Sequence, residues 1–106
     1  MATTVISIFK KDGAVFLDAA AANSDRESKF SPELKEQLAS VTGTLRNNDM
    51  FLKSAEYVWD QDLCTLTITH SIRDYEEFRT AYKPISTEAA WKSAGWVRIS
   101  RDIVTE

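Results

Sequence analysis

The sequence is poor in the residues that form crosslinks, metal sites and phosphate-binding loops. Its 106 residues include a single cysteine, Cys64, which excludes an internal disulfide. The three glycines stand far apart, so no glycine-rich phosphate-binding loop is present. His70 is the only histidine. On one extended strand it would lie about 20 Å from Cys64, at 3.3 Å per residue, which is too far for both to bind one metal ion. We therefore expect neither a metal nor a cofactor.

Long apolar runs and basic clusters are also missing. No run is long enough to span a membrane, and the N-terminal residues lack the basic segment of a signal peptide. This predicts a cytoplasmic protein without membrane contact. The net charge of −3 and the pI near 5.2 disfavour nucleic acid as a partner. Hydrophobic residues make up 43% and charged residues 27%, an ordinary globular composition, and we expect one domain over residues 1–106.

Residues 63–71 alternate between apolar and polar side chains, which predicts a strand with one face on a core. One face carries Cys64, Leu66, Ile68, His70 and Ile72, and the other carries Thr65, Thr67, Thr69 and Ser71. Thr and Ile also suit the pleated surface of a sheet. In this interpretation Cys64 is a small buried side chain within the strand.

Three further segments show strand-like alternation. Residues 3–9 place Val5 and Phe9 on one side. Residues 50–59 form another strand, which the polar segment 60–62 joins to the central strand as an antiparallel hairpin. Residues 96–104 form the last strand, with Val97, Ile99 and Ile103 on its core face and Arg98, Ser100 and Asp102 on the other.

The first helix has clear start and stop signals. Ser31 is suited to the N-cap and is followed by a proline at the first helical position. Leu34 and Leu38 then begin an apolar stripe. Gly43 is typical of a helix end, so the helix is expected over residues 32–42.

A second helix is predicted over residues 75–94. Asp74, with Glu77 three residues later, has the form of a capping box. Pro84 interrupts this helix, because proline lacks the N–H donor and disfavours a helical conformation at the preceding residue.

The segment between the first strand and the first helix is harder to interpret. An Asp-Gly turn favours a returning strand over residues 14–17, whereas the alanines at 19–22 favour a short helix. Both alternatives stay open for residues 14–22. Residues 23–29 are polar and charged, and they are expected to form a mobile loop.

The resulting order is strand, helix, strand, strand, helix, strand. This predicts a ferredoxin-like βαββαβ sandwich, an α+β fold with a four-stranded antiparallel sheet and both helices on one face. The predicted core is Leu66, Ile68, Phe78, Trp91 and Ile99, covered by Leu34 and Leu38 of the first helix.

Candidate site residues come from the polar and aromatic side chains near this core. His70 is the weak catalytic candidate, because histidine alone titrates near neutral pH without perturbation. A hydrogen-bonded core histidine is the alternative. The candidates for ligand binding are Trp59, His70, Tyr82, Trp91 and Arg98. The aromatic members of this set can instead simply fill the core.

Residues 63–95 resemble the second half of proteins of the dimeric α+β-barrel superfamily, which includes the antibiotic-biosynthesis monooxygenase-like families. The resemblance lies in a strand that ends at Ser71, a helix start at Asp74-Tyr75, then Phe78, and an interrupted helix before the last strand. It implies a homodimer that encloses a cavity, and cofactor-free oxygenases occur among such proteins.

The leading hypothesis is a homodimer that binds a small molecule in a cavity between sheet and helices or between subunits. One alternative is a non-catalytic protein–protein interaction module, and another is a cofactor-free monooxygenase-like enzyme. A sheet face without helices would carry the hydroxyl row 65–71 with Arg98 and Asp102, and we expect it to pack on a second copy. RNA is disfavoured, because RNA-binding sheets of this topology place aromatics where the central strand has threonines.

Overall fold

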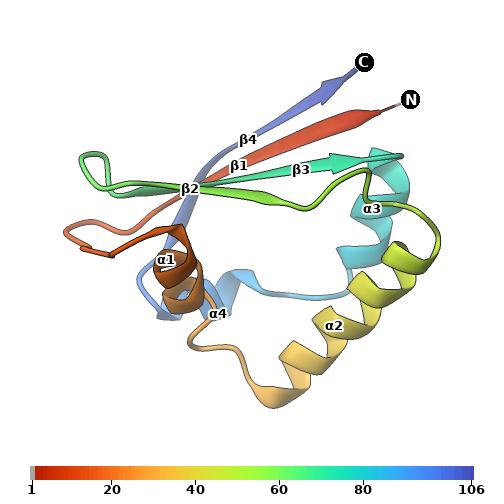
Figure 1. Cartoon of the computed structure of the whole chain (residues 1–106). Helices are drawn as coiled ribbons and strands as arrows, with labels where there is room; N and C mark the ends of the chain where they lie inside the picture. Colours follow the sequence, from red (N-terminus) through yellow and green to blue (C-terminus); the bar gives the residue numbers. More distant parts are fainter. Residues whose placement is uncertain (1) are drawn as a thin grey trace.

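The computed structural model describes residues 2–106 and shows an antiparallel sheet with all helices on one of its faces (Figure 1). The elements are β1 (Thr3–Lys10), α1 (Ala19–Arg26), α2 (Pro32–Asn47), β2 (Glu56–Asp60), β3 (Thr65–Ile72), α3 (Tyr75–Tyr82), α4 (Glu88–Ser93) and β4 (Val97–Thr105). The strand order is β2-β3-β1-β4. The predicted ferredoxin-like α+β fold is confirmed. Among the described residues, no helix is long and apolar enough to cross a membrane.

The central strand β1 pairs with β3 on one side and with β4 on the other. Its odd-numbered side chains from Thr3 to Phe9 are buried on the helix-covered face, and Ile6 and Ile8 are half-buried on the other. On the helix-covered face, each β1 side chain has a cross-strand neighbour on β3 and another on β4. In one row Ser7 lies between Ile68 of β3 and Arg101 of β4.

The predicted helix starts are confirmed by their caps. The hydroxyl of Ser31 accepts a hydrogen bond from the Leu34 amide at 3.2 Å, with proline in the first turn of α2. The carboxylate of Asp74 accepts one from the Glu77 amide at 3.0 Å. The predicted break near Pro84 is also present, because α3 ends at Tyr82 and the next helix begins five residues beyond Lys83, at Glu88.

The first predicted helix is longer than its sequence signals indicate. Gly43 lies within α2, so the prediction that it ends the helix is wrong. The helix ends where Asp49 adopts a left-handed φ of 62°. The amide of Asp49 then donates to the Arg46 carbonyl, and the amide of Met50 donates to that of Leu45. Because Leu45 and Met50 pack in one core cluster, the helix end combines hydrogen bonding with apolar burial.

The predicted mobile loop over residues 23–29 is also wrong, because α1 continues through its first half to Arg26. Asp18 caps this helix by accepting from the Ala21 amide at 2.9 Å. Asp25 then anchors it through Lys11 Nζ at 2.6 Å and through Trp96 Nε1 at 2.9 Å. Residues 14–17 form neither the strand nor the helix that the sequence left open, and the short helix begins at residue 19.

Two strands, β2 and β3, are shorter than the sequence predicts. The segment before β2 contributes only an isolated bridge between Phe51 and Ile72, so residues 50–55 are not the continuous strand expected. The hairpin of β2 and β3 is confirmed, but β3 starts at Thr65. Cys64 lies in its turn with φ of 55° and is half-buried, so its placement on the core face of a strand is wrong.

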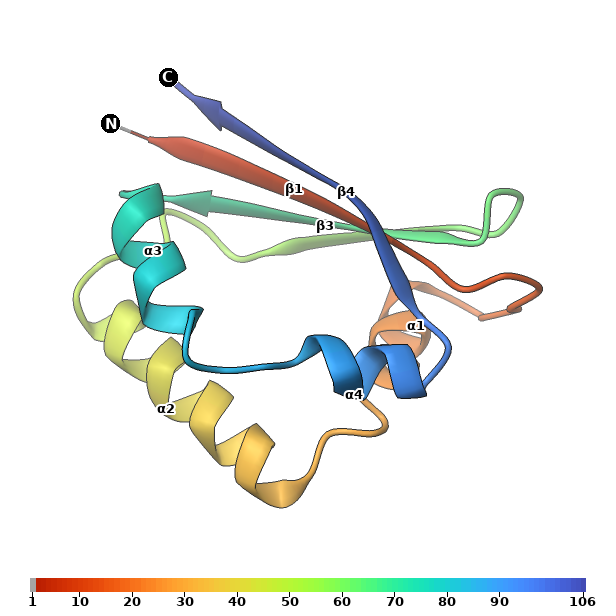
Figure 2. The ribbon, with the colours of Figure 1, turned by 180° about the vertical axis from the view of Figure 1, so that it is seen from behind.

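The largest correction concerns β4. Phe9 pairs with Arg98, whereas its neighbour Ile8 pairs with Ser100, so β4 has one extra residue at this point. The exposed fractions of Val97 and Ile99 are 51% and 54%, so the predicted burial of Ile99 and the predicted place of Val97 on the core face are both wrong. Figure 2 shows how strongly β4 bends along its length. The strand therefore turns Arg98, and not Val97, toward the face that bears the helices.

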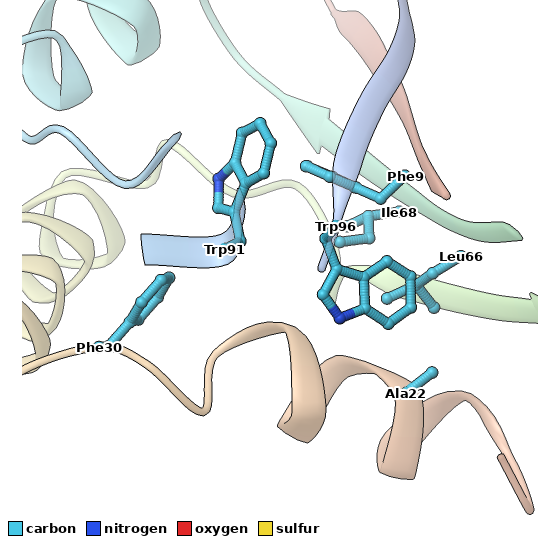
Figure 3. Packing of buried hydrophobic residues seen from close by; sticks show 7 residues of the cluster. All are labelled: Phe9, Ala22, Phe30, Leu66, Ile68, Trp91 and Trp96. Atoms are coloured by element: carbon cyan, nitrogen blue, oxygen red, sulfur yellow. The ribbon is translucent and has the colours of Figure 1, made fainter. Parts of the chain in front are cut away.

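The buried residues form two separate clusters. The first core cluster consists of Phe9, Ala22, Phe30, Leu66, Ile68, Trp91 and Trp96. The second core cluster consists of Val5, Leu45, Met50, Ile72 and Phe78. Figure 3 shows Trp96 between Ala22 of α1 and Leu66 of β3. The predicted burial of Leu66, Ile68, Phe78 and Trp91 is confirmed, but Phe78 lies in the other cluster, and Leu34 and Leu38 are only partly buried.

The corrected β4 can be tested by comparing two truncations. Leu66 is fully buried, so Leu66→Ala should lower the free energy of unfolding by about 2–5 kcal/mol. Val97 is half-exposed, and Val97→Ala should cost less than about 1 kcal/mol. Urea titration in dilute solution measures both. Equal losses would contradict the bulged register of β4.

Candidate functional site

A cleft of about 600 Å³ lies between the helix-covered face of the sheet and the helices, and we call it the cleft. It separates the two core clusters. Phe9 and Trp91 of the first cluster form one wall, and Phe78 of the second lies on the other. Its volume lies within the range of roughly 300–1,000 Å³ that is common for ligand pockets.

The sheet supplies the floor of the cleft. Ser7 of β1 and Ile68 of β3 are direct cross-strand partners at its centre. Arg101 of β4 extends the same row, and its Nε donates to Ser7 Oγ at 3.1 Å. His70 lies two residues along β3 from Ile68, so both side chains point to this face.

Aromatic side chains of α3 form much of the opposite wall. The ring centroid of Phe78 lies 4.9 Å from that of Tyr82 and 5.7 Å from that of His70. The hydroxyl groups of Tyr82 and Thr42 are 2.7 Å apart and form a hydrogen bond between α3 and α2. Because the helix breaks at Pro84, the loop that follows lines the rim through Ile85 and its neighbours.

Arg26 reaches the cleft from the last turn of α1, and its side chain is 12% exposed. Its Nε and Nη2 donate to Asn23 Oδ1 at 3.2 and 3.0 Å. Its guanidinium carbon lies 4.7 Å from the ring centroid of Phe9, which is a cation–π arrangement. The carboxylate of Glu27 is 3.5 Å from Nη2 and is half-exposed.

Positive charge dominates the lining of the cleft, although the whole chain has a net charge of −3. The basic lining residues are Arg26, Arg79, Lys83, Arg98 and Arg101, and the acidic ones are Glu27 and Glu88. Glu88 is already paired with Lys92, at 2.6 Å. The cleft is therefore a local basic site on an acidic protein.

The pKa values of the lining groups reflect burial and mutual repulsion. Burial lowers the pKa of His70 from its usual value of 6.5, and the positive charges of Arg101 and Arg26 lower it further. Burial also lowers the pKa of Arg26. The pKa of Arg101 is lowered by burial and then by Arg98, although much of the Arg101 side chain stays exposed at the edge strand. At neutral pH the cleft therefore presents cationic arginines beside a neutral imidazole.

Four of the five residues proposed from the sequence as ligand contacts line the cleft. These are His70, Tyr82, Trp91 and Arg98. Trp59 does not line it. Its ring packs on Phe16 and Trp96, and its Nε1 donates to Gln61 Oε1 at 3.0 Å. Whether the other four contact a ligand stays a prediction.

Sequence reasoning missed the arginines at 26 and 101. Arg26 fell in the segment interpreted as a mobile loop, and the signal that was available is Asp18, a good N-cap ahead of four alanines. The alternation of the last strand puts Arg101 on the same face as Ile99 and Ile103, but the sequence did not single it out as a site residue. Its pairing with Ser7 across the sheet brings it to the cleft.

The cleft brings basic, aromatic and hydroxyl side chains together. No side-chain hydrogen bond joins His70 to a carboxylate or hydroxyl among the described residues. Over residues 2–106, no group of three or more His, Cys, Asp or Glu side chains is suitably placed for a metal ion. A second cavity of about 380 Å³ is also present, and Thr42, His70 and Tyr82 line both this cavity and the cleft.

The fold and the cleft together define a small ferredoxin-like α+β domain with a hollow under its sheet. Two solved structures resemble it over the whole chain. The protein YjcS, from a structural-genomics study, gives a TM-score of 0.52 at 6% identity and covers 100% of this chain and 99% of its own. Rv0793 from Mycobacterium tuberculosis gives 0.50 at 13% identity, with 100% and 95% covered. No protein-family model and no curated protein matches the sequence. The relationship shown is a distant one, at the level of the fold.

The lowered pKa of His70 predicts a pH-dependent stability. As the pH falls through 6.5, the imidazole of His70 takes up its proton in the unfolded chain before it does so in the folded protein. The free energy of unfolding should therefore decrease with falling pH, until the pH lies below the lowered pKa of folded His70. His70→Gln should lack this part of the pH dependence. The two profiles can be compared by thermal unfolding, with the folded pKa measured by NMR titration of the imidazole. A folded pKa at or above 6.5 would contradict the environment described.

Proposed function

We propose that this protein binds a small organic molecule in the cleft between the sheet and the helices. The observation that carries the proposal is the separation of the core into two clusters with a hollow of about 600 Å³ between them. Protein interiors are normally close-packed, so a domain of 106 residues that leaves such a hollow gives up contacts that would stabilise it. A bound molecule would restore those contacts.

The chemistry of the lining supports the same proposal. Ligand pockets are mostly apolar and aromatic, with a few polar groups that orient the ligand. Here the apolar part comes from Phe9, Ile68, Phe78 and Trp91, all of them buried or nearly so. The polar groups project from the floor and from the ends of the helices. The resemblance to the dimeric α+β-barrel superfamily, which includes proteins that bind small molecules, is consistent with this function.

We further propose that the protein is a homodimer, with the helix-free face of the sheet, here called the open face, as its interface. Side chains that alternate with the buried rows give this face exposed aliphatic groups. They include Val58 at 60%, Val97 at 51% and Val104 at 51% exposure, and Ile6 and Ile8 lie half-buried between them. The open face is thus more apolar than the hydroxyl row expected from the sequence.

A second copy fits the open face for two reasons. Its centre combines aliphatic groups with the small hydroxyls of Thr67 and Thr69, which permit close approach of two sheets. The open face also carries both signs of charge, with Lys10 at the end of β1 and Asp102 on the edge strand β4. A twofold axis could pair such charges reciprocally. Burial of these exposed valines would supply the driving force at roughly 25 cal/mol per Å².

Binding in the cleft can be tested with a fragment screen followed by amide NMR. Fragments that bind should shift the signals of Ser7, Ile68 and His70 on the floor of the cleft. Ile85→Trp should fill the rim and weaken the best fragments at least about 10-fold, equivalent to about 1.4 kcal/mol of lost binding. Ile99→Trp, on a half-exposed residue outside the cleft, is the matched control. If no fragment shifts the floor residues, or if Ile85→Trp binds as wild type does, the proposal fails.

The interface proposal predicts a mutation that separates the subunits. Thr67 lies between Ile8 and Val58 at the centre of the open face. Thr67→Arg should weaken association by about 2 kcal/mol or more, because the interface would bury an unpaired charge. Thr80→Arg adds the same side chain at an exposed position on α3 and should leave the dimer intact. Light scattering over a dilution series measures both. A monomeric wild type at high concentration would refute the dimer.

A further inference from the structure

We propose that the cleft selects aromatic carboxylates, with the carboxylate held by Arg101 and Arg26 and the ring held among the aromatic walls. This inference rests on the proposed function and names the chemical class of its ligand. The inference rests on two arginines that line an otherwise aromatic and apolar cleft. A hydrogen bond to Ser7 holds Arg101, and hydrogen bonds to Asn23 hold Arg26.

Arg101 is oriented for an incoming anion. Its Nε donates to Ser7 Oγ at 3.1 Å, which ties the guanidinium to the floor of the cleft. Neither of its terminal nitrogens has a hydrogen-bond or ion-pair partner among residues 2–106. A guanidinium has five N–H donors in a fixed fork that matches the two oxygens of a carboxylate. Arg101 lines the cleft, and its terminal N–H groups are therefore available to an anion that enters it.

Arg26 is held at a second position by a different set of contacts. Asn23 fixes its Nε and Nη2, and the ring of Phe9 supports its face. Its nearest carboxylate, that of Glu27, stands 3.5 Å from Nη2, beyond a good hydrogen bond, and is 45% exposed. The charge of Arg26 is therefore only partly compensated, although the side chain itself is mostly enclosed.

The two arginines act on the same volume of the cleft. Arg101 bonds Ser7 and Arg26 lies over the ring of Phe9, and Ser7 and Phe9 are neighbours on the same face of β1. Both positive charges also lower the pKa of His70, after burial. A cation withdrawn from water without a matched anion is costly, and an arriving carboxylate removes that cost. The excess of positive lining residues would also attract anions into the cleft despite the net charge of −3.

The walls fit the remainder of the ligand. Phe9 and Trp91 meet edge to face at 5.2 Å, and Phe78 and Tyr82 do so at 4.9 Å. Aromatic rings gain from edge-to-face and offset contacts with further rings. A flat aromatic body between these two pairs would bury apolar area on both sides, while its carboxylate reaches the floor.

Matched pairs of probes test the selection by charge. Benzoate, 1-naphthoate and indole-3-acetate would be compared with their neutral amides, benzamide, 1-naphthamide and indole-3-acetamide. Each pair has nearly the same shape. The carboxylates should bind at least about 10-fold more tightly, because a charge-assisted hydrogen bond contributes more than 1.4 kcal/mol. Affinities would be measured by amide NMR titration, which also reports whether the probe occupies the cleft.

Variants then test which residues are responsible. Arg101→Gln and Arg26→Gln should each reduce the carboxylate preference at least several-fold and leave the affinity for the amides unchanged. Arg101→Lys should restore part of it, since the charge remains but the fork is lost. Lys35→Gln removes one positive charge at an exposed position of α2 outside the cleft and should have no effect. Thermal unfolding of each variant confirms that it is folded.

The outcomes separate this inference from the proposed function. If amides and carboxylates bind the cleft equally, selection by charge is refuted while small-molecule binding stands. If the preference survives in both arginine variants, the assignment of these two residues is refuted. If none of the six probes shifts the floor residues at millimolar concentration, this inference is refuted, and the fragment screen alone decides the proposed function.

Discussion

The position of α1 against the sheet depends on one carboxylate. Asp25 accepts from Lys11 Nζ at 2.6 Å and from Trp96 Nε1 at 2.9 Å, and so joins the end of β1, the helix and the start of β4. Burial raises its pKa, but these hydrogen bonds and the nearby lysine charges outweigh burial and leave the pKa below its usual value. The next residue is Arg26. The contact that anchors the helix thus also directs a guanidinium into the cleft.

The bulge in β4 has a comparable effect on the opposite side of the cleft. Without an extra residue, the alternation of the last strand would turn Arg98 and Arg101 to opposite faces. The register shift lets both approach the helix-covered face, beside Phe9 and Ser7. The same shift leaves Val97 on the open face. One irregularity therefore makes the cleft basic and the open face apolar, which are the two surfaces on which the proposed functions rest.

Sequence patterns predicted the fold because its determinants are local. The caps at Ser31 and Asp74 and the alternation in residues 65–72 each specify an element within a few residues. The site was harder to predict, because Arg26 and Arg101 reach it through contacts between distant parts of the chain. Asp25 meets Trp96 across 71 residues, and Arg101 meets Ser7 across 94. No spacing within one segment encodes such contacts. His70 and Arg98 were proposed for their chemistry, and the helices and the bulge brought them to one cleft.

The cleft itself follows from how the helices cover the sheet. The only fully buried residue of α2 is Leu45 in its last turn, while Leu34 and Leu38 are partly buried against the first cluster. The break at Pro84 separates Phe78 of α3 from Trp91 of α4, so each helix joins a different cluster. A continuous helix would carry its apolar stripe across the middle of the sheet and fill the hollow. The proline-containing loop instead forms the rim, and the space beneath it is bounded by Ser7 and His70 on the floor. The break that lowers packing at the centre of the domain is thereby the feature that creates the cleft.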